Sequence, residues 1–186
     1  GNDSDILLGS NGNDFLSGGG DEDILIGGRN NDVLQGGNDD DFLLGEEGND
    51  ILQGGRGNDF LNAGNGNDLA LGGRGNDILS GGEGSDILDG GNASDFLDGG
   101  NNDDALIGGA GNDTVNGGDG NDILVGGGGS TLFGLTNGNV LVAFDAASPD
   151  QATTIRVTGV DGNLIGIDTR PADGMLYGVT DTNKIY

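Results

Sequence analysis

The amino-acid sequence predicts an all-β fold, in which residues 1–129 form a two-sheet parallel solenoid and residues 130–186 form a small antiparallel β unit. Three observations support this prediction. A nine-residue pattern recurs from the first residue to about Val125, as in GGRGNDFLN at Gly54–Asn62. The sixth position of the pattern is an aspartate in every repeat. The eighth position is a leucine in nearly every repeat, and Ala70 is the only residue there that is smaller than valine.

Each repeat divides into a turn half and a strand half. The glycine-rich half, such as GGRGND, suits a tight turn because glycine adopts positive φ without a steric penalty. The next three residues, such as FLN or ILS, favour a short strand. Two repeats complete one turn of the solenoid, so alternate repeats share a sheet and one leucine per strand points inward. This leucine ladder is too narrow to offset the backbone entropy of folding by itself, so the fold needs another source of stabilisation.

Composition excludes several classes of function. The chain of 186 residues has 32 acidic and 6 basic residues, a formal charge of −26 and only 32% apolar residues. A charge of this sign disfavours nucleic acid and anionic membrane surfaces as partners. The sequence has no Cys and no His, which excludes disulfides, thiolate metal sites and most zinc or copper chemistry. It has no run of about 18 apolar residues that would predict membrane insertion.

The aspartates of the sixth position indicate a calcium-binding array. Calcium takes about six to eight oxygen ligands from carboxylates and backbone carbonyls, and a GGxGxD turn supplies both. Stacked turns would enclose one ion between successive loops, which relieves the repulsion between neighbouring carboxylates. The column consists of Asp5, Asp14, Asp23, Asp32, Asp41, Asp50, Asp59, Asp68, Asp77, Asp86, Asp95, Asp104, Asp113 and Asp122.

The repeat resembles the RTX (hemolysin-type) calcium-binding nonapeptide, G-G-x-G-x-D-x-U-x. The resemblance covers about two-thirds of the chain. It implies a parallel β-roll, secretion by bacteria to the cell exterior or cell surface, and folding triggered by extracellular calcium. It also implies that the fourteen aspartates are the side-chain ligands. Seven loops along each edge leave about six gaps, so we expect roughly twelve ions, with the two end sites near Asp5 and Asp122 weaker than the rest.

Several repeats depart from the consensus. The fourth position, normally glycine, is occupied by Asp21, Asn30, Asp39, Ala93 and Asn102. Asn and Asp tolerate a left-handed backbone, whereas Ala93 does so only at a cost. Ser10 and Glu46 replace the second glycine, and Ala63 replaces the first. The alternative to calcium binding is that Asp and Asn only form polar turns around the leucine ladder, but this alternative leaves the charge uncompensated.

Bulky residues at the seventh and ninth positions predict apolar patches on the outside of the solenoid. On one sheet we expect a patch near the N-terminal end, formed by Ile6, Leu8, Ile24, Ile26, Phe42 and Leu44. On the other sheet we expect a patch toward the C-terminal end, formed by Leu69, Leu71, Ile107, Ile123 and Val125. Two different patches on opposite faces favour head-to-tail self-association into a staggered filament or layer. The alternative is that flanking domains cover them.

The C-terminal unit has a different pattern. Alternating strands and the turn signals Asn137-Gly138 and Asp161-Gly162 predict antiparallel pairing. The segment Leu164–Tyr177, LIGIDTRPADGMLY, is similar to a bacterial propeller-like domain of unknown function. By that comparison the chain holds little more than one blade. We interpret Asp168 and Arg170 in this segment as a structural ion pair rather than a site.

The sequence does not predict an enzyme. Without His, an HExxH metalloprotease motif and a Ser-His-Asp triad are absent, and no GxSxG, GxGxxG or P-loop motif occurs. Ice binding, another possibility for a calcium β-roll, would need a flat Thr or Asx row, whereas the third position varies. We therefore predict an extracellular calcium-binding β-roll that serves as a structural or adhesive surface element. The alternative is a calcium-triggered folding and secretion module of a larger secreted enzyme or toxin.

Overall fold

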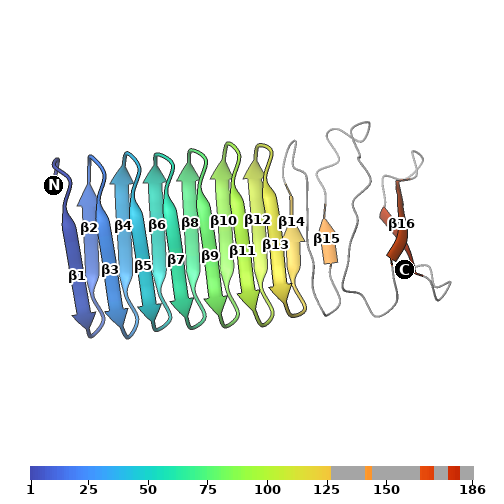
Figure 1. Cartoon of the computed structure of the whole chain (residues 1–186), viewed down its shortest axis with the longest axis horizontal. Helices are drawn as coiled ribbons and strands as arrows, with labels where there is room; N and C mark the ends of the chain where they lie inside the picture. Colours follow the sequence, from blue (N-terminus) through green and yellow to red (C-terminus); the bar gives the residue numbers. More distant parts are fainter. Residues whose placement is uncertain (127–140, 144–163, 170–175, 181–186) are drawn as a thin grey trace.

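The computed structural model of the chain describes residues 1–126, 141–143, 164–169 and 176–180. The repeats form a solenoid in which odd-numbered and even-numbered strands make two facing parallel sheets (Figure 1). The odd sheet contains β1 (Ile6–Asn11), β3 (Ile24–Arg29), β5 (Phe42–Glu47), β7 (Phe60–Asn65), β9 (Ile78–Glu83), β11 (Phe96–Asn101) and β13 (Thr114–Asp119). The even sheet contains β2 (Phe15–Gly19), β4 (Val33–Asn38), β6 (Ile51–Arg56), β8 (Leu69–Arg74), β10 (Ile87–Asn92), β12 (Ala105–Ala110), β14 (Ile123–Val125) and β15 (Leu141–Ala143). The predicted two-sheet solenoid is confirmed.

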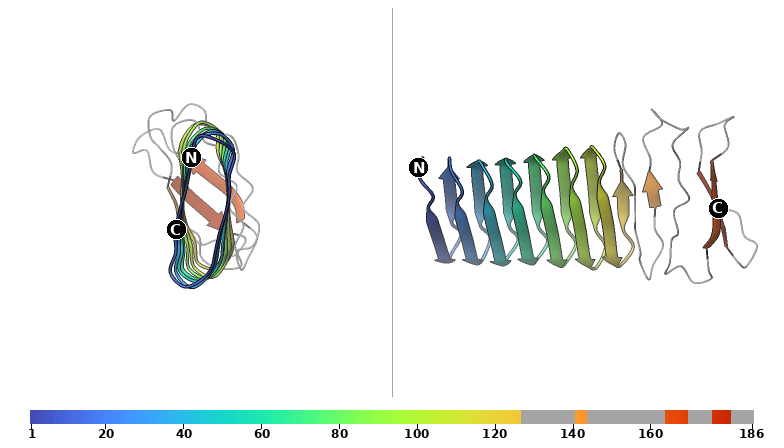
Figure 2. Two further views of the ribbon diagram at one scale, coloured as in Figure 1. Left: turned by 90° about the vertical axis from the view of Figure 1, so that its left-hand side faces the viewer. Right: turned by 45° about the horizontal axis from the view of Figure 1, so that its top comes forward.

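Strand pairing follows the repeat without a slip. Each strand pairs in parallel with the strand two repeats later, so that Leu25 lies beside Leu7 and Leu43 beside Leu25. Strands of the two sheets run in opposite directions across the solenoid (Figure 1). Viewed along the axis, successive turns nearly superimpose, so both sheets are flat (Figure 2). Flat sheets are unusual in proteins and are typically stabilised by stacking or by side-chain ladders, and the buried leucine column is such a ladder.

The leucines of the eighth position form the core. From β2 to β14 the burial alternates, with the eighth-position side chain and the first-position glycine buried and the seventh-position side chain exposed or half-buried, whereas Leu7 and Gly9 of β1 are only half-buried. The leucines from Leu25 to Leu124 have no exposed surface, whereas Leu16 at the N-terminal end is 7% exposed. Ala70 occupies the same column between its leucine neighbours Leu52 and Leu88. The core is thus a single ladder, one side chain wide per strand.

The turns need residues with positive φ at two positions. Glycines at the second and fourth positions of the repeat have positive φ, for example Gly55 at 116° and Gly57 at 125°. The substitutions at these positions keep a positive φ, although a smaller one than the glycines. Their φ angles fall between 61° and 82°, and the residues are Ser10, Asp21, Asn30, Asp39, Glu46, Ala93 and Asn102. The prediction that non-glycine residues would have to adopt the left-handed conformation is confirmed, and Ala93 is the one with neither a polar side chain nor glycine's freedom.

The C-terminal part differs in one respect from the prediction. Strand β15, which we expected in the antiparallel unit, pairs in parallel with β14 and extends the even sheet, with Leu124 beside Val142. Strands β16 (Leu164–Thr169) and β17 (Leu176–Thr180) are antiparallel, as predicted. The turns Asn137-Gly138 and Asp161-Gly162 lie outside the described residues, as does Arg170 of the expected ion pair. The boundary at residue 129 therefore stays a prediction.

The described residues contain no helix with the length and apolar character needed to cross a membrane.

Replacing Ala93 with glycine should stabilise the solenoid. Ala93 has φ 82°, a conformation that costs an L-residue roughly 1–2 kcal/mol, and glycine removes that cost while adding about 0.5–1 kcal/mol of unfolded-state entropy. We expect Ala93→Gly to raise the free energy of unfolding in calcium by up to about 1 kcal/mol, measured by urea denaturation. Ala110→Gly is the matched control, because Ala110 precedes the positive-φ position of its turn, and it should lower stability. Equal effects of the two changes would contradict this account.

Candidate metal centre

The aspartates of the sixth position form two ladders, one at each edge of the solenoid. Each aspartate ends a turn and immediately precedes a strand. Its carbonyl oxygen accepts a hydrogen bond from the first strand residue of the next turn of the solenoid, as in Ile24 N–H to Asp5 O at 2.9 Å. One ladder contains Asp14, Asp32, Asp50, Asp68, Asp86, Asp104 and Asp122. The other contains Asp5, Asp23, Asp41, Asp59, Asp77, Asp95 and Asp113. The repeat thus brings all fourteen predicted residues into two columns.

From Asp23 to Asp122, one oxygen of each ladder carboxylate has a backbone partner. The backbone N–H of Asp23 donates to Oδ1 of Asp41 at 2.8 Å, and the N–H of Asp41 donates to Oδ1 of Asp59 at 2.8 Å. Twelve such bonds span the two ladders at 2.7–3.1 Å. These bonds fix each side chain in one orientation, so the second oxygen also has a fixed place.

The second carboxylate oxygen is buried without a hydrogen-bond partner. This is the case for Oδ2 of Asp14, Asp23, Asp32, Asp41, Asp50, Asp59, Asp68, Asp77, Asp86, Asp95, Asp104 and Asp122. From Asp23 to Asp122 the ladder residues are only 1–4% exposed. A buried charged oxygen that accepts no hydrogen bond is strongly unfavourable. Twelve such atoms in equivalent places indicate a ligand that the amino-acid chain does not itself provide.

First-position glycines bring backbone oxygens close to these carboxylates. A methyl group on Gly81 would lie 2.4 Å from Oδ2 of Asp86 and 2.5 Å from the carbonyl oxygen of Gly99, and the same arrangement recurs at Gly72. Carboxylate and carbonyl oxygens therefore converge on one small region in several repeats, and in other repeats the atoms nearest to the first-position glycine belong to the aspartate side chain. A side chain at the first position would fill this region, which is the physical reason for the glycine.

The donor set fits a hard divalent cation held partly by backbone. Among the described residues, no three acidic side chains lie close enough together to hold an ion by themselves. A site here would combine a carboxylate oxygen with carbonyl oxygens of neighbouring turns, and this all-oxygen set is the one that calcium prefers. The unpaired Oδ2 atoms supply the negative charge. When bound, calcium would supply the positive charge that these ladders lack.

Burial raises the pKa values of nine of the ladder carboxylates. The hydrogen bond from the preceding aspartate lowers each pKa, but burial outweighs it, and neighbouring carboxylates raise most of them further. The pKa is about 7 for Asp59 and Asp104, and about 6 for Asp41, Asp50, Asp68 and Asp95. The pKa values of Asp77, Asp86 and Asp122 are also raised, again mainly by burial. Without a cation, the interior favours the protonated form.

Comparison with known families identifies the array. The model of the RTX calcium-binding nonapeptide repeat (four copies) matches residues 1–34, 35–70, 62–97, 71–106 and 98–132. The chain belongs to this RTX family. Residues 140–186 match a domain of unknown function, DUF4394, which carries no structural description, so the propeller-like architecture stays a prediction. A search of curated proteins returned no match.

The N-terminal end of the ladder differs from its interior. The Asp5 side chain is 47% exposed and lies 3.2 Å from the amino group of Gly1, whereas Asp122 at the other end is 1% exposed. The expectation of weaker end sites stays a prediction for both. Ala63 places a methyl group where the other repeats have glycine, and it is buried beside the site of its own repeat, that of Asp68.

A second ladder lies on the outside of the turns, and the sequence analysis missed it. Fifth-position side chains accept hydrogen bonds from the backbone of the next turn, as in Asn49 N–H to Asn31 Oδ1 at 2.9 Å and Asn67 N–H to Asn49 Oδ1 at 2.8 Å. The other edge has the same arrangement, with Asn76 N–H donating to Asn58 Oδ1 at 2.9 Å. The recurrence of Asn, Asp or Ser at the fifth position was the available signal.

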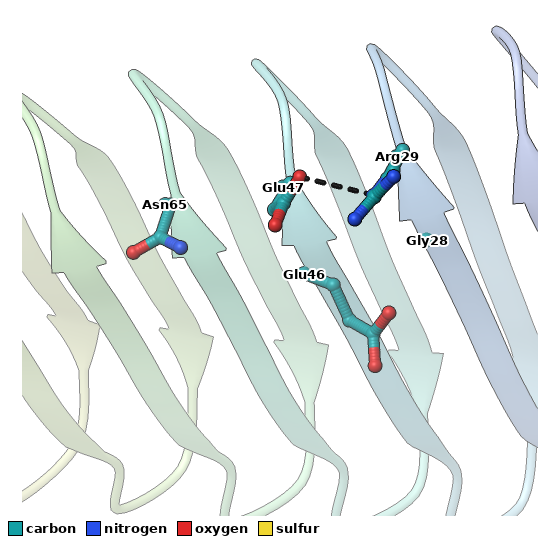
Figure 3. Close-up of a pocket in the computed structure, with 5 residues that line it drawn as sticks. All are labelled: Gly28, Arg29, Glu46, Glu47 and Asn65. Carbon is teal, nitrogen blue, oxygen red and sulfur yellow. Dashed lines mark ion pairs between the residues drawn. The ribbon is translucent and has the colours of Figure 1, made fainter.

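A shallow hollow on the outside of the turns adds no second metal site. It is lined by Gly28, Arg29, Glu46, Glu47 and Asn65, which come from β3, β5 and β7 (Figure 3). Arg29 Nε lies 3.3 Å from Glu47 Oε2, and both side chains are exposed. An exposed ion pair of this kind contributes about 0–1 kcal/mol. The chemistry of the chain is therefore concentrated in the aspartate ladders.

The raised pKa values predict that acid stabilises the calcium-free fold but has little effect on the calcium-saturated fold. In chelator, the folded chain binds more protons than the unfolded chain between about pH 4 and pH 7, because the pKa values rise from 3.8 to about 6–7. Stability of the calcium-free fold should therefore increase as pH falls through this window. In saturating calcium the ladder carboxylates of the folded chain would be deprotonated, as they are in the unfolded chain, so stability should change little over the same window. Far-UV circular dichroism at both conditions measures this, and parallel pH trends would contradict it.

Substitution of one ladder carboxylate should act in opposite directions with and without calcium. Asp77→Asn removes a buried charge, so it should stabilise the fold in chelator. In calcium it should lower the free energy of unfolding by about 3 kcal/mol at an ion concentration near 100 Kd, since one site is lost.

Asp98→Asn is the matched control for charge. Asp98 lies on the outside of β11, where its Oδ1 accepts a hydrogen bond from Asn116 Nδ2 at 2.8 Å. The same loss of one negative charge there should leave the calcium midpoint almost unchanged. If Asp77→Asn and Asp98→Asn shift the midpoint equally, the ladder is not the calcium site.

Proposed function

We propose that this chain is an extracellular, calcium-folded β-roll that serves as a structural or adhesive element at a bacterial surface. The twelve buried Oδ2 atoms without partners carry this proposal. They make the folded state unfavourable until cations bind, so folding depends on the calcium concentration of the surrounding solution. RTX repeats are typical of secreted proteins, and extracellular calcium modules bind with Kd values of about 0.1–1 mM.

Roughly twelve calcium ions are proposed to stabilise the roll. Each ladder has seven aspartates, which leave six gaps between successive turns. Twelve divalent ions would supply a charge of about +24 by this stacking logic, close to the formal charge of −26. Ligand that binds only the folded chain stabilises it by mass action, so folding and calcium binding would occur together.

The outer faces of the two sheets support a role in surface contacts. Eleven large apolar side chains are 37–71% exposed, among them Ile6, Phe15 and Ile87. Apolar surface of this extent marks an interaction site in many proteins. Self-association and adhesion through these faces are therefore part of the proposal.

The alternative function is a calcium-triggered folding and secretion module of a larger enzyme or toxin. The match of residues 140–186 to a separate domain family favours this alternative, because the roll is there joined to a second unit whose folding it would assist. In that case the calcium-loaded roll would assist the folding of the neighbouring domain in the same chain and would not assemble with other copies.

A calcium titration followed by circular dichroism and light scattering tests the proposal. We expect little ordered structure in chelator at neutral pH, a cooperative gain of β-structure at sub-millimolar to millimolar calcium, and an increase in molecular mass once the roll has folded. Magnesium is the control cation, because its octahedral preference suits these carbonyl-rich sites poorly. An ordered roll that persists in excess chelator would contradict the proposal. Folding in calcium without any increase in mass would favour the alternative.

A further inference from the structure

The outer surface of each sheet carries two rows of side chains. We call the outer surface of the odd sheet face A and that of the even sheet face B. Row seven and row nine contain the seventh-position and ninth-position residues, which flank the inward leucine. Strand registers place Ile6, Ile24 and Phe42 side by side in row seven of face A, and Val33, Ile51 and Leu69 side by side in row seven of face B. Every residue of row seven except Thr114 is apolar.

Charge is almost absent from these rows. Asp89 and Asp98 are the only charged residues among the fourteen residues of row nine, and row seven has none. The carboxylates of the ladders lie at the edges, where calcium neutralises them. The two faces are thus the surfaces through which two copies of this acidic chain can approach at the lowest electrostatic cost.

The polarity of the row-nine side chains changes from one end of the solenoid to the other, and the direction of this change is opposite on the two faces. On face A it begins with Leu8, Ile26 and Leu44 and continues with polar residues from Asn62. On face B it begins with Ser17, Gln35 and Gln53, and the later strands carry Leu71, Ile107 and Val125. The apolar half of row nine therefore lies at the N-terminal end of face A and at the C-terminal end of face B.

We propose that face A of one copy packs on face B of a second copy whose solenoid axis runs in the opposite direction. This inference rests on the proposed self-association and adds its geometry. The strands of the two sheets of one solenoid run in opposite directions (Figure 1). When the second copy is turned by 180° about the normal to the faces, its row seven therefore lies on row seven of the first copy, and its row nine lies on row nine. The same half-turn places Leu8 opposite Val125 and Ile26 opposite Ile107.

The other packings match the rows less well. Two copies with parallel axes, packed face A on face B, place row seven on row nine. Face A on face A, or face B on face B, can bring row seven onto row seven, but then the apolar half of row nine lies on the polar half. Only the antiparallel packing of face A on face B matches both rows. Its one charged mismatch is Asp89, which lies opposite Leu44.

A second copy suits these faces for two further reasons. A second copy presents side chains at the same strand spacing, so contacts can repeat along the whole length of the face. On face A the rings of Phe42 and Phe60 already stack at this spacing, with centroids 4.8 Å apart and planes at 7°. Seven strands about 4.8 Å apart, with roughly six residues each, form a face of about 650 Å². This approaches the ~800 Å² per partner of a stable interface, whereas the staggered contact of three strands expected from the sequence would cover less than half of it.

Because faces A and B both remain available after one contact, the packing continues. A copy that binds face A of its neighbour through its own face B leaves its own face A free for the next copy. The contact is therefore heterologous and open-ended. Growth proceeds perpendicular to the sheets, and the product is a stack of β-rolls with alternating axis directions.

Two blocked variants test this geometry in calcium. Ile24→Lys with Ile78→Lys blocks face A, and Ile51→Lys with Ile87→Lys blocks face B; these four side chains are 39–50% exposed. In sedimentation velocity, wild-type protein should form large species at high concentration, and each blocked variant alone should be monomeric. An equimolar mixture of the two variants should form heterodimers only, because it contains one free face A and one free face B per pair.

The controls separate this inference from the proposed function. Asn65→Lys with Asn92→Lys adds the same charge on the turns and should assemble as wild type does. Circular dichroism of every variant reports calcium-dependent folding independently of assembly. If all proteins fold in calcium but wild type stays monomeric, the packing is overturned while the calcium-folded roll stands. If the face-B-blocked variant dimerises alone, face A packs on face A, and the proposed geometry is overturned although self-association stands.

Cross-linking tests the direction of the axes. The chain has no natural cysteine. Ile26→Cys is introduced into the face-B-blocked variant, and either Ile107→Cys or Val33→Cys is introduced into the face-A-blocked variant. In mixtures of the two proteins, a short thiol cross-linker should join Ile26→Cys to Ile107→Cys at least tenfold faster than it joins Ile26→Cys to Val33→Cys. Faster capture of Val33→Cys would indicate parallel axes and overturn the proposal. Asp89→Leu, which removes the charged mismatch, should lower the concentration at which wild-type protein assembles.

Discussion

The uncompensated carboxylate in the interior is the constraint on which this structure depends. The roll buries the ladder aspartates from Asp23 to Asp122, and in eleven of them the backbone satisfies one carboxylate oxygen while the other has no hydrogen-bond partner. The second oxygen is held in place by that same hydrogen bond, so it cannot rotate toward water. Calcium would resolve the conflict because it coordinates several oxygens at once and carries two charges. The leucines form the core between the sheets, and in the proposed function calcium binding decides whether the sheets close.

The glycine pattern follows from this constraint. Glycines at the second and fourth positions supply the positive φ of the turn, and those at the first position leave room for a carboxylate and a neighbouring carbonyl. The departures show how much each requirement tolerates. Ser10, Glu46 and Ala93 adopt the left-handed backbone at a local cost, while Ala63 adds a methyl group next to a carboxylate. None of them interrupts the register of the strands.

The separation of charge and apolar surface has a consequence for association. Charges lie in the turns, where ions bind, and apolar rows lie on the two flat faces. A chain with a formal charge of −26 would repel its copies until calcium binds at the edges. The same ions that permit folding would therefore permit the faces to meet, which links assembly to the calcium concentration without a separate regulatory site.

The repeat pattern alone predicts the period, the two sheets, the identity of the buried leucines and the column of aspartates, because a nine-residue repeat leaves one arrangement in which every leucine points inward. It did not determine the local contacts of the carboxylates. Only the tertiary structure showed that Oδ1 of Asp41 is satisfied by the backbone of Asp23 while Oδ2 is not, since these atoms come from separate turns of the solenoid. It also decided that β15 extends the even sheet in parallel, because pairing with β14 depends on an available strand edge and not on the local pattern of residues 141–143.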